Sequence, residues 1–286
     1  MTVSAEHCIT LEQALFIAEN SSPTIQKALL KREQSHQNLI TRKAILEQPL
    51  FTCNSPKMSL KMLELEVENF EIEYALAKLL LEKNVTTLFY NVYMAQLSLD
   101  IAREELDNMQ QRRNATADKV EAKLTAGIGL YQADLNLSSA RSAVKNKEMA
   151  LENAKASFKE YIGVDLNDEI NVLASVTSSD FIFIPMDKTV RYGLELRMEI
   201  CRNLENYRTQ IEIEKQNQLN AELAYEISLE KYKNGDITGM DLNLYQSQLS
   251  NRKLSMAQAQ IYYKLELLNL KIATRYDFEK TNLLWI

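Results

Sequence analysis

The sequence predicts an all-α fold made of long antiparallel coiled-coil helical hairpins arranged in two repeats. The first observation is that only six glycines and four prolines occur in 286 residues, whereas these two residues together make up about 12 % of an average protein. Such a chain cannot supply the frequent turns of a sandwich, a propeller or a doubly wound α/β sheet. The second observation is that apolar residues recur in steps of three and four. The third is that two glycine-containing turns resemble each other.

The longest expected helix lies between Pro56 and Gly127, because the seventy residues between them contain neither glycine nor proline. At 1.5 Å per residue this helix is about 100 Å long, whereas helices of globular proteins average about three turns. A near-heptad seam follows Leu63, Val67, Phe70, Tyr74, Ala77, Leu81, Val85, Leu88, Val92, Ala95 and Leu99. A second set beside it contains Leu65, Ile72, Leu76, Leu80, Tyr90, Tyr93 and Leu97. Two adjacent seams need neighbours on both sides, which favours the wall of a larger assembly over a compact bundle.

A second helix is expected after Gly127 and Gly129, running as far as Gly163. Residues 57–162 are therefore predicted to form a hairpin of unequal arms that turns at Gly127–Gly129. The stretch 165–188 is rich in β-branched residues and contains a short apolar run, which predicts a small non-helical belt with one or two strands.

A second hairpin is expected in the remainder of the chain. Its first helix runs from about Val190 to Asn234, turns at Gly235–Gly239, and continues as a last helix to about Arg275. The predicted organisation is one elongated helical domain over residues 1–286, with repeat one at 9–164, the belt at 165–188 and repeat two at 189–280.

The two turns share a pattern that suggests an internal duplication. Each has a lysine, a glycine four residues later, and then the tetrapeptide Asp-Leu-Asn-Leu, at 134–137 and 241–244. The glycine suits the left-handed position that ends a helix. In the second copy Thr238 is the predicted N-cap, with Asp241 in the first helical turn. A recurrence about 107 residues apart suits duplication of a whole hairpin; the alternative is chance recurrence of turn residues.

Two helix starts are also predicted near the N-terminus. Thr10 and Gln13 have the spacing of a capping box, and Pro23 follows Ser22 as the first residue of the next helix.

Composition and charge exclude several classes of protein. The net charge of −6 leaves no basic footprint for nucleic acid or anionic lipid. Two histidines and three scattered cysteines give no metal-ligand spacing and no disulfide framework, and no nucleotide-binding or hydrolase motif occurs. We therefore expect no enzyme, cofactor or metal site. The sequence also predicts neither a signal peptide nor a membrane-spanning helix.

The order of these motifs resembles the outer-membrane efflux channels of bacteria, the TolC-like family. The matching segments are T-L-E-Q-A-L…N-S-S-P-T-I near the start, the long helix with its K-x-x-x-G…D-L-N-L turn, Y-I-G-V-D-L at 161–166, and K-Y-K-N-G-D-I-T-G-M-D-L from Lys231. The likeness covers most of residues 9–278, and the second turn is its most specific part.

The resemblance implies a homotrimer in which two repeats per chain give twelve helices that close a periplasmic tunnel, an α-barrel. The family continues into a β-barrel across the outer membrane. The hairpin tips dock a periplasmic adaptor, or membrane fusion protein, which links the channel to an inner-membrane pump. The implied function is export through one component of a tripartite system, and the implied location is the outer membrane and periplasm.

The resemblance also implies roles for individual residues. Tyr232 falls on an aromatic position of the family's gate, Asp241 on its first pore-facing aspartate, and Asp134 on the counterpart in the first turn. Leu244 stands where a second aspartate falls in the family. Three copies of Asp241 around a narrow axis would repel one another and attract cations, which would raise their pKa; the alternative is a helix-start carboxylate. The predicted adaptor-docking residues are Gly127, Ile128, Gly129, Leu130, Gly235, Asp236, Ile237, Thr238 and Gly239.

The sequence departs from the family in lacking the β-barrel strands. Only residues 47–59, with two prolines, could hold strands in the first half, and 190–234 contains no turn signal. A deletion-bearing gene product, an engineered barrel-less protein and a homologue reduced to its periplasmic part all fit. The alternative function is a coiled-coil scaffold or interaction protein that retains the fold without transport. A curved membrane-binding dimer is disfavoured by the negative charge, and an enzyme by acids spread along solvated helix faces.

Overall fold

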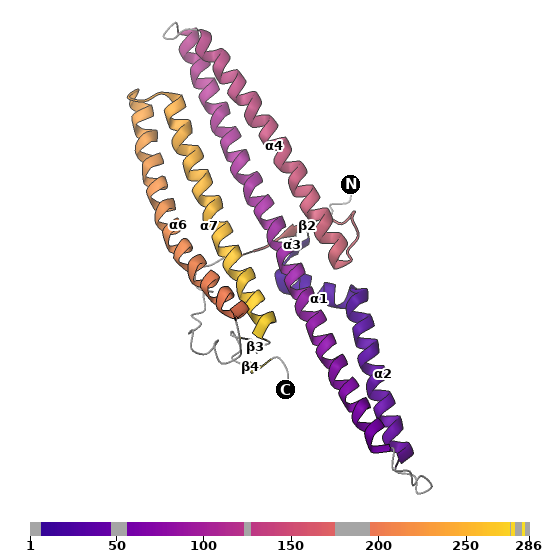
Figure 1. Cartoon of the computed structure of the whole chain (residues 1–286). Helices are drawn as coiled ribbons and strands as arrows, with labels where there is room; N and C mark the ends of the chain where they lie inside the picture. The colour runs from indigo at the N-terminus through magenta and orange to yellow at the C-terminus, as the bar shows by residue number, and fades with distance from the viewer. Residues whose placement is uncertain are drawn as a thin grey trace. The chain divides into compact units, whose positions relative to one another are not determined.

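The computed structural model describes residues 7–46, 56–122, 127–174, 195–274, 276–277 and 282–283. The helices are α1 (Leu11–Ser21), α2 (Pro23–Leu46), α3 (Pro56–Glu121), α4 (Gly127–Ile162), α6 (Glu195–Asn234) and α7 (Gly239–Thr274), and the strands are β1 (His7–Ile9), β2 (Ile170–Val172), β3 (Tyr276–Asp277) and β4 (Asn282–Leu283) (Figure 1). The predicted all-α class is confirmed. Over these residues, no helix combines the length and the apolar character that crossing a membrane requires.

The chain divides into two compact units. The first unit comprises Met1–Thr87 and Lys159–Asn171, and the second comprises Leu88–Phe158 and Val172–Ile286. The helix α3 belongs to both, because the division falls within it.

The long helix predicted after Pro56 is confirmed, because α3 contains 66 residues. None of the seam residues that follow Leu63 is exposed, and four of them are buried: Leu81, Val85, Val92 and Leu99. In the second apolar set, Leu65, Leu76 and Leu80 are exposed in the single chain. One apolar face of α3 is therefore packed within the chain, and part of the other has no cover.

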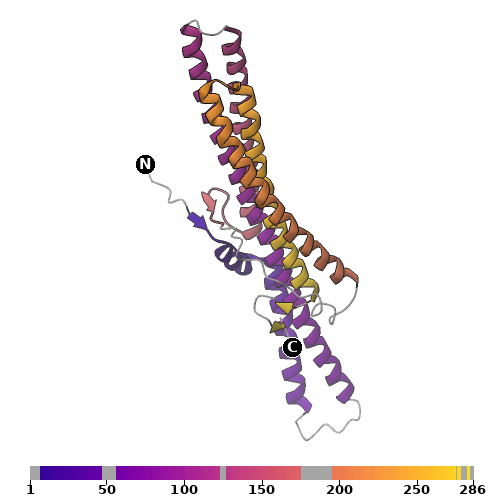
Figure 2. The ribbon, with the colours of Figure 1, turned by 90° about the vertical axis from the view of Figure 1, so that its left-hand side faces the viewer.

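The first unit is built from α1, α2 and the first part of α3, with β1 paired to β2. The capping box predicted at Thr10 and Gln13 is present at the start of α1, and α2 begins at Pro23 as predicted. The strand β2 lies in the predicted belt, whereas its pairing with β1 was not predicted; the rest of the belt, 175–188, lies outside the described residues. Figure 2 shows α2 beside the start of α3.

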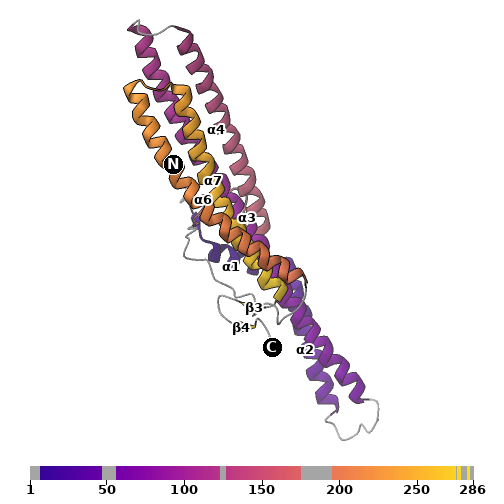
Figure 3. The ribbon, with the colours of Figure 1, turned by 60° about the vertical axis from the view of Figure 1, so that its left-hand side comes forward.

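In the second unit α3 runs antiparallel to α4, and α6 runs antiparallel to α7. Ion pairs at 2.8 Å between Arg113 and Asp134 and at 3.1 Å between Arg103 and Glu148 join α3 to α4. The helices α6 and α7 of the second hairpin lie side by side (Figure 3), and a core of their side chains joins them. The residues of that core are Ile200, Leu204, Ile211, Ala259, Tyr263 and Leu270.

The prediction that Gly127–Gly129 form the first turn is wrong. The helix α3 ends at Glu121 and α4 begins at Gly127, so both glycines lie in the first turn of α4. Glycine is tolerated there because the first amide groups of a helix have no intrahelical acceptor to lose. Among the described residues, only Gly163 and Gly235 have a positive φ. The predicted exit from the helix at Gly163 is thereby confirmed.

The two Asp-Leu-Asn-Leu segments are also not structurally equivalent, contrary to the prediction. Asp134 is the eighth residue of α4, whereas Asp241 is the third residue of α7. A shift of five residues rotates a helical position by about 140°. As a result, the first leucine of the tetrapeptide is exposed in α4 (Leu135) and buried in α7 (Leu242).

Candidate functional site

The turn between α6 and α7, here the tip turn (residues 231–241), has the geometry predicted for its glycine. Gly235 has φ +84° and follows the last residue of α6. The Asp236 amide donates to the Lys231 carbonyl at 2.8 Å and the Gly235 amide donates to the Tyr232 carbonyl at 3.1 Å. These two bonds form a Schellman motif, which satisfies carbonyls at the end of α6.

The start of α7 is closed by Thr238 and Asp241, as predicted. The Asp241 amide donates to Thr238 Oγ1 at 3.2 Å, while the Thr238 amide and hydroxyl donate to Asp241 Oδ2 at 3.0 and 2.7 Å. The hydroxyl bond and then the amide bond lower the pKa of Asp241, because both favour the ionised carboxylate. In the single chain, then, Asp241 acts as a capping residue.

Tyr232 packs across the tip turn. Its ring lies beside Gly239, where an added Cβ would be 3.7 Å from Tyr232 Cε2. Lys119 of α3 places its Nζ 5.8 Å from the centroid of the same ring, which is within the range of a cation–π contact. The contact brings the last turns of α3 and α6 together, so both hairpin turns lie at the same end of the second unit (Figures 1 and 3).

A polar cluster behind the tip turn joins three helices and was missed by sequence reasoning. Arg112 of α3 donates through Nη2 to Gln246 Oε1 of α7 at 2.5 Å and also bonds Tyr225 of α6. Burial lowers the pKa of Arg112, and Tyr225 and Tyr232 partly oppose that shift. The available signal was Gln246 itself, because a glutamine at a buried helical position between two buried leucines needs a polar partner.

The predicted residue Asp134 has a different environment from Asp241. Its Oδ1 accepts from Arg113 Nε of α3 at 2.8 Å, and about half of its side chain is exposed. At the start of α4 the predicted docking residue Ile128 is 78 % exposed, and Met240 in the first turn of α7 is 83 % exposed. The end of the second unit therefore combines the capped start of α7 with large apolar side chains in solvent.

Exposed apolar side chains also follow α4 and α6 on the second unit. We call these sets the edge stripes. The helix α4 contacts α3, α3 contacts α7 and, near the tip turn, α6, and α6 packs against α7. The α4 stripe contains Ile128, Tyr131, Leu135 and Met149, and the α6 stripe contains Ile213, Leu219, Leu223 and Ile227. Within each set the spacing places the side chains on one helix face.

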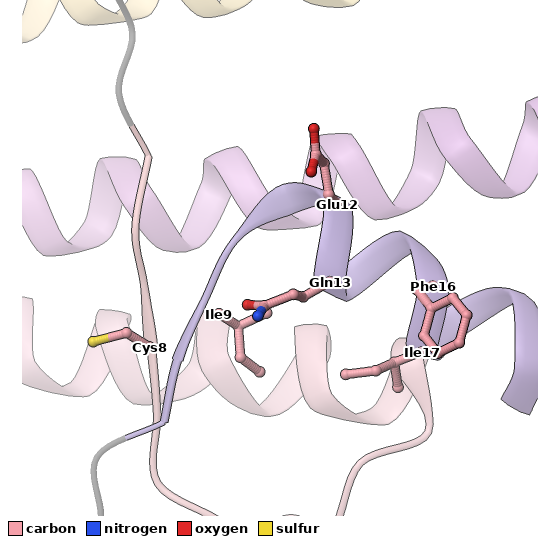
Figure 4. Close-up of a pocket in the computed structure, with 6 residues that line it drawn as sticks. All are labelled: Cys8, Ile9, Glu12, Gln13, Phe16 and Ile17. Carbon is pink, nitrogen blue, oxygen red and sulfur yellow. The ribbon is translucent and has the colours of Figure 1, made fainter.

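Two further observations concern possible ligand sites among the described residues. A hollow of about 530 Å³ in the first unit is lined by the largely apolar residues of β1 and α1 shown in Figure 4. Within the described ranges, no group of three or more histidine, cysteine or acidic residues is placed to hold a metal ion.

Comparison with known proteins identifies the fold. No family model and no curated protein matches the sequence. Solved structures of outer-membrane channels do match. The outer membrane protein VceC of Vibrio cholerae superposes with a TM-score of 0.68 at 11 % identity, covering 93 % of this chain and 95 % of that one. The CmeC outer membrane channel of Campylobacter jejuni gives 0.67 at 12 % identity, with 94 % and 88 % covered.

The outer-membrane channel OprN gives a TM-score of 0.71 at 11 % identity, covering 94 % of this chain and 90 % of that chain. The chain thus has the helical fold of outer-membrane efflux channels, and the predicted resemblance is confirmed at the level of the fold.

Proposed function

We propose that this chain is a subunit of an outer-membrane efflux channel and forms the periplasmic α-helical tunnel of a tripartite export system. The observation that carries the proposal is the edge stripes, seen on a chain whose fold matches such channels over more than nine-tenths of its length. The protein would act by assembly rather than by chemistry.

The edge stripes suit contacts between copies. Exposed apolar side chains along one helix face favour an interaction site, because their burial removes apolar area from water. The stripes lie on different helices, so the α6 stripe of one copy would contact the α4 stripe of the next. A contact between unlike surfaces closes into a ring when the rotation between copies permits. A homotrimer is the closed form that we propose.

The tips of the second unit are the proposed docking surface for a periplasmic adaptor, through which the channel would reach an inner-membrane pump. Ile128 and Met240 supply exposed apolar contacts. The other proposed docking residues are Gly127, Gly129 and Leu130 in the first turn of α4 and Gly235, Asp236, Ile237, Thr238 and Gly239 in the tip turn. Asp241, Tyr232 and Asp134 stay as proposed gate residues around the tunnel axis.

The test is the mass of the protein in solution, with Leu223→Glu as the variant. Leu223 lies in the middle of the α6 stripe and is exposed in the single chain, so the substitution leaves the fold intact while placing a charge in the proposed contact. We expect the unmodified chain to form trimers and the variant to shift toward monomers. Gln210→Glu, an exposed position on α6 outside the stripe, is the matched control.

A monomeric unmodified chain at all concentrations would contradict the proposal. Trimers that fail to capture a candidate adaptor in a pull-down would instead favour the alternative function, a scaffold that keeps the fold without transport.

A further inference from the structure

The end of α6 carries the only asparagine in the sequence that is followed directly by a glycine. Asn234 is the last residue of the helix, and Gly235 is the residue with positive φ that follows it. Both are exposed, and a Cβ added at Gly235 would meet nothing within 4 Å. Because glycine has no Cβ, the backbone on this side of Asn234 is open to close approach by other atoms.

The amide side chain of Asn234 is also free to move. It forms no hydrogen bond to any residue that the structure describes. Asn20 is a useful contrast, because it too is followed by a small residue, Ser21. The Nδ2 of Asn20 donates to the Phe16 carbonyl at 2.8 Å, and the hydroxyl of Ser21 donates to the Ile162 carbonyl. The two asparagines therefore differ in how firmly their surroundings hold them.

The backbone at Asn234 is restrained by local bonds. The amide of Gly235 donates to the Tyr232 carbonyl at 3.1 Å, as part of the Schellman motif of the tip turn. The ends of helices open at a small cost in free energy, and opening here frees the Gly235 nitrogen. Lys231 and Lys233 lie in the same last turn of α6. Their positive charges favour loss of the proton from that nitrogen.

We propose that Asn234 is a site of spontaneous deamidation. The Gly235 nitrogen loses its proton to water and attacks Cγ of Asn234; the bond from Cγ to Nδ2 then breaks, and ammonia leaves with a proton taken back from water. Water opens the resulting succinimide ring at either of its carbonyl carbons. Attack at Cγ gives aspartate with the ordinary backbone, whereas attack at the backbone carbon gives isoaspartate, in which the chain runs through the side chain. The overall reaction consumes water and releases ammonia.

Both products change the tip turn. Each places a negative charge at the C-terminal end of α6, where the helix dipole disfavours it, and beside the exposed Asp236. Isoaspartate also inserts a further carbon atom into the backbone before Gly235, which is incompatible with the spacing of the Schellman bonds. The modification itself does not depend on the proposed function, although it falls within the proposed docking surface.

Mass spectrometry of the full-length chain during storage at neutral and mildly alkaline pH tests the site, because deamidation replaces an amide by a heavier acid. We expect Asn234 to convert at least about tenfold faster than Asn20, because opening a helix end costs less free energy than opening a packed joint. The conversion should accelerate as pH rises, because the attacking nitrogen must lose its proton. Equal rates at Asn234 and Asn20, or no conversion at Asn234, would overturn the proposal.

Two variants locate the reaction. Asn234→Gln keeps an amide but requires a larger ring, so the peptide that contains the tip turn should keep its mass during storage. Asn220→Gln, at an exposed position of α6, is the matched control and should leave the conversion at Asn234 unchanged. A tip peptide that still gains mass in Asn234→Gln would place the reaction at another residue and contradict the proposal.

Discussion

Two helices in this protein are each followed by a glycine with a positive φ, one in closely packed and the other in open surroundings. The joint turn, at the end of α4 in the first unit, places Gly163 at φ +77°, and the tip turn of the second unit places Gly235 at φ +84°. A Cβ added at Gly163 would lie 2.8 Å from Ser21 Cβ, whereas one added at Gly235 would meet nothing within 4 Å.

The difference shows that a glycine at positive φ can permit close packing at one helix end and leave another helix end exposed. At the joint turn, Ser21 Oγ donates to the Ile162 carbonyl at 2.5 Å, and the buried Lys159 donates to the Leu166 carbonyl at 3.0 Å. The first bond joins α1 to the end of α4, and the second joins α4 to the segment that follows it. At the tip turn the bonds are local, so the backbone is fixed while its surface stays open.

The largest expected effect is that of Gly163→Ala. The substitution adds the strain of a side chain at positive φ and a clash with Ser21, so we expect about 2 to 4 kcal/mol loss in the free energy of unfolding. Gly235→Ala adds the strain alone and should lose about 1 kcal/mol. Urea unfolding of both variants measures the two values.

A double variant separates strain from clash at the joint turn. Ser21→Gly removes the Cβ that Gly163→Ala would meet, so the combined variant should lose less than the two single losses added together. Equal losses of unfolding free energy for Gly163→Ala and Gly235→Ala, with no such coupling, would show that Ser21 does not make Gly163 the more costly position to replace.

The second expected effect concerns the polar cluster behind the tip turn. Gln246→Leu removes the acceptor of a half-buried guanidinium, so we expect about 1 to 3 kcal/mol lower unfolding free energy. Arg112→Met combined with Gln246→Leu removes both partners and should recover part of that loss. Thermal unfolding of the single and double variants checks this, and a double variant worse than the sum of the single ones would contradict a paired role.

These contrasts also show what could be predicted from the sequence. The positions of glycine and proline predicted the long helix, since the region between Pro56 and Gly127 contains neither residue, and Gly235 was assigned correctly from its place after a helix. Gly127 was misplaced because glycine permits a left-handed conformation without requiring one. The environment that decides Gly163 comes from Ser21, more than 140 residues earlier, which local patterns cannot reveal.

The candidate site was predictable to a similar extent. The cap formed by Thr238 and Asp241 depends on residues three apart, so its spacing was visible in the sequence. The bond from Arg112 to Gln246 spans 134 residues and depends on how three helices pack. The repeated tetrapeptide led to a wrong prediction for another reason: identical residues at different distances from a helix start face different directions.

The smallest expected effect is the pH dependence that Asp241 of the tip turn contributes to the stability of the protein. Because hydrogen bonds from Thr238 lower the folded pKa of Asp241, its contribution to stability is present above the unfolded pKa and is lost as pH falls through the folded pKa. Asp241→Ala should therefore lower the thermal midpoint slightly at neutral pH and leave it unchanged in acid. Asp236→Asn, an exposed acid in the same turn, is the control.

The same carboxylate distinguishes a cap from a gate ring. In a monomer, the hydrogen bonds from Thr238 stabilise the ionised Asp241 carboxylate without an opposing charge from other copies. Carbon-13 titration of the Asp241 carboxyl should therefore give a pKa below the ordinary value. In an assembly that brings three Asp241 side chains to one axis, repulsion would raise the pKa above the monomer value. If trimers titrate like monomers, Asp241 is a capping residue in both states, and the proposed acidic ring at the tip is wrong.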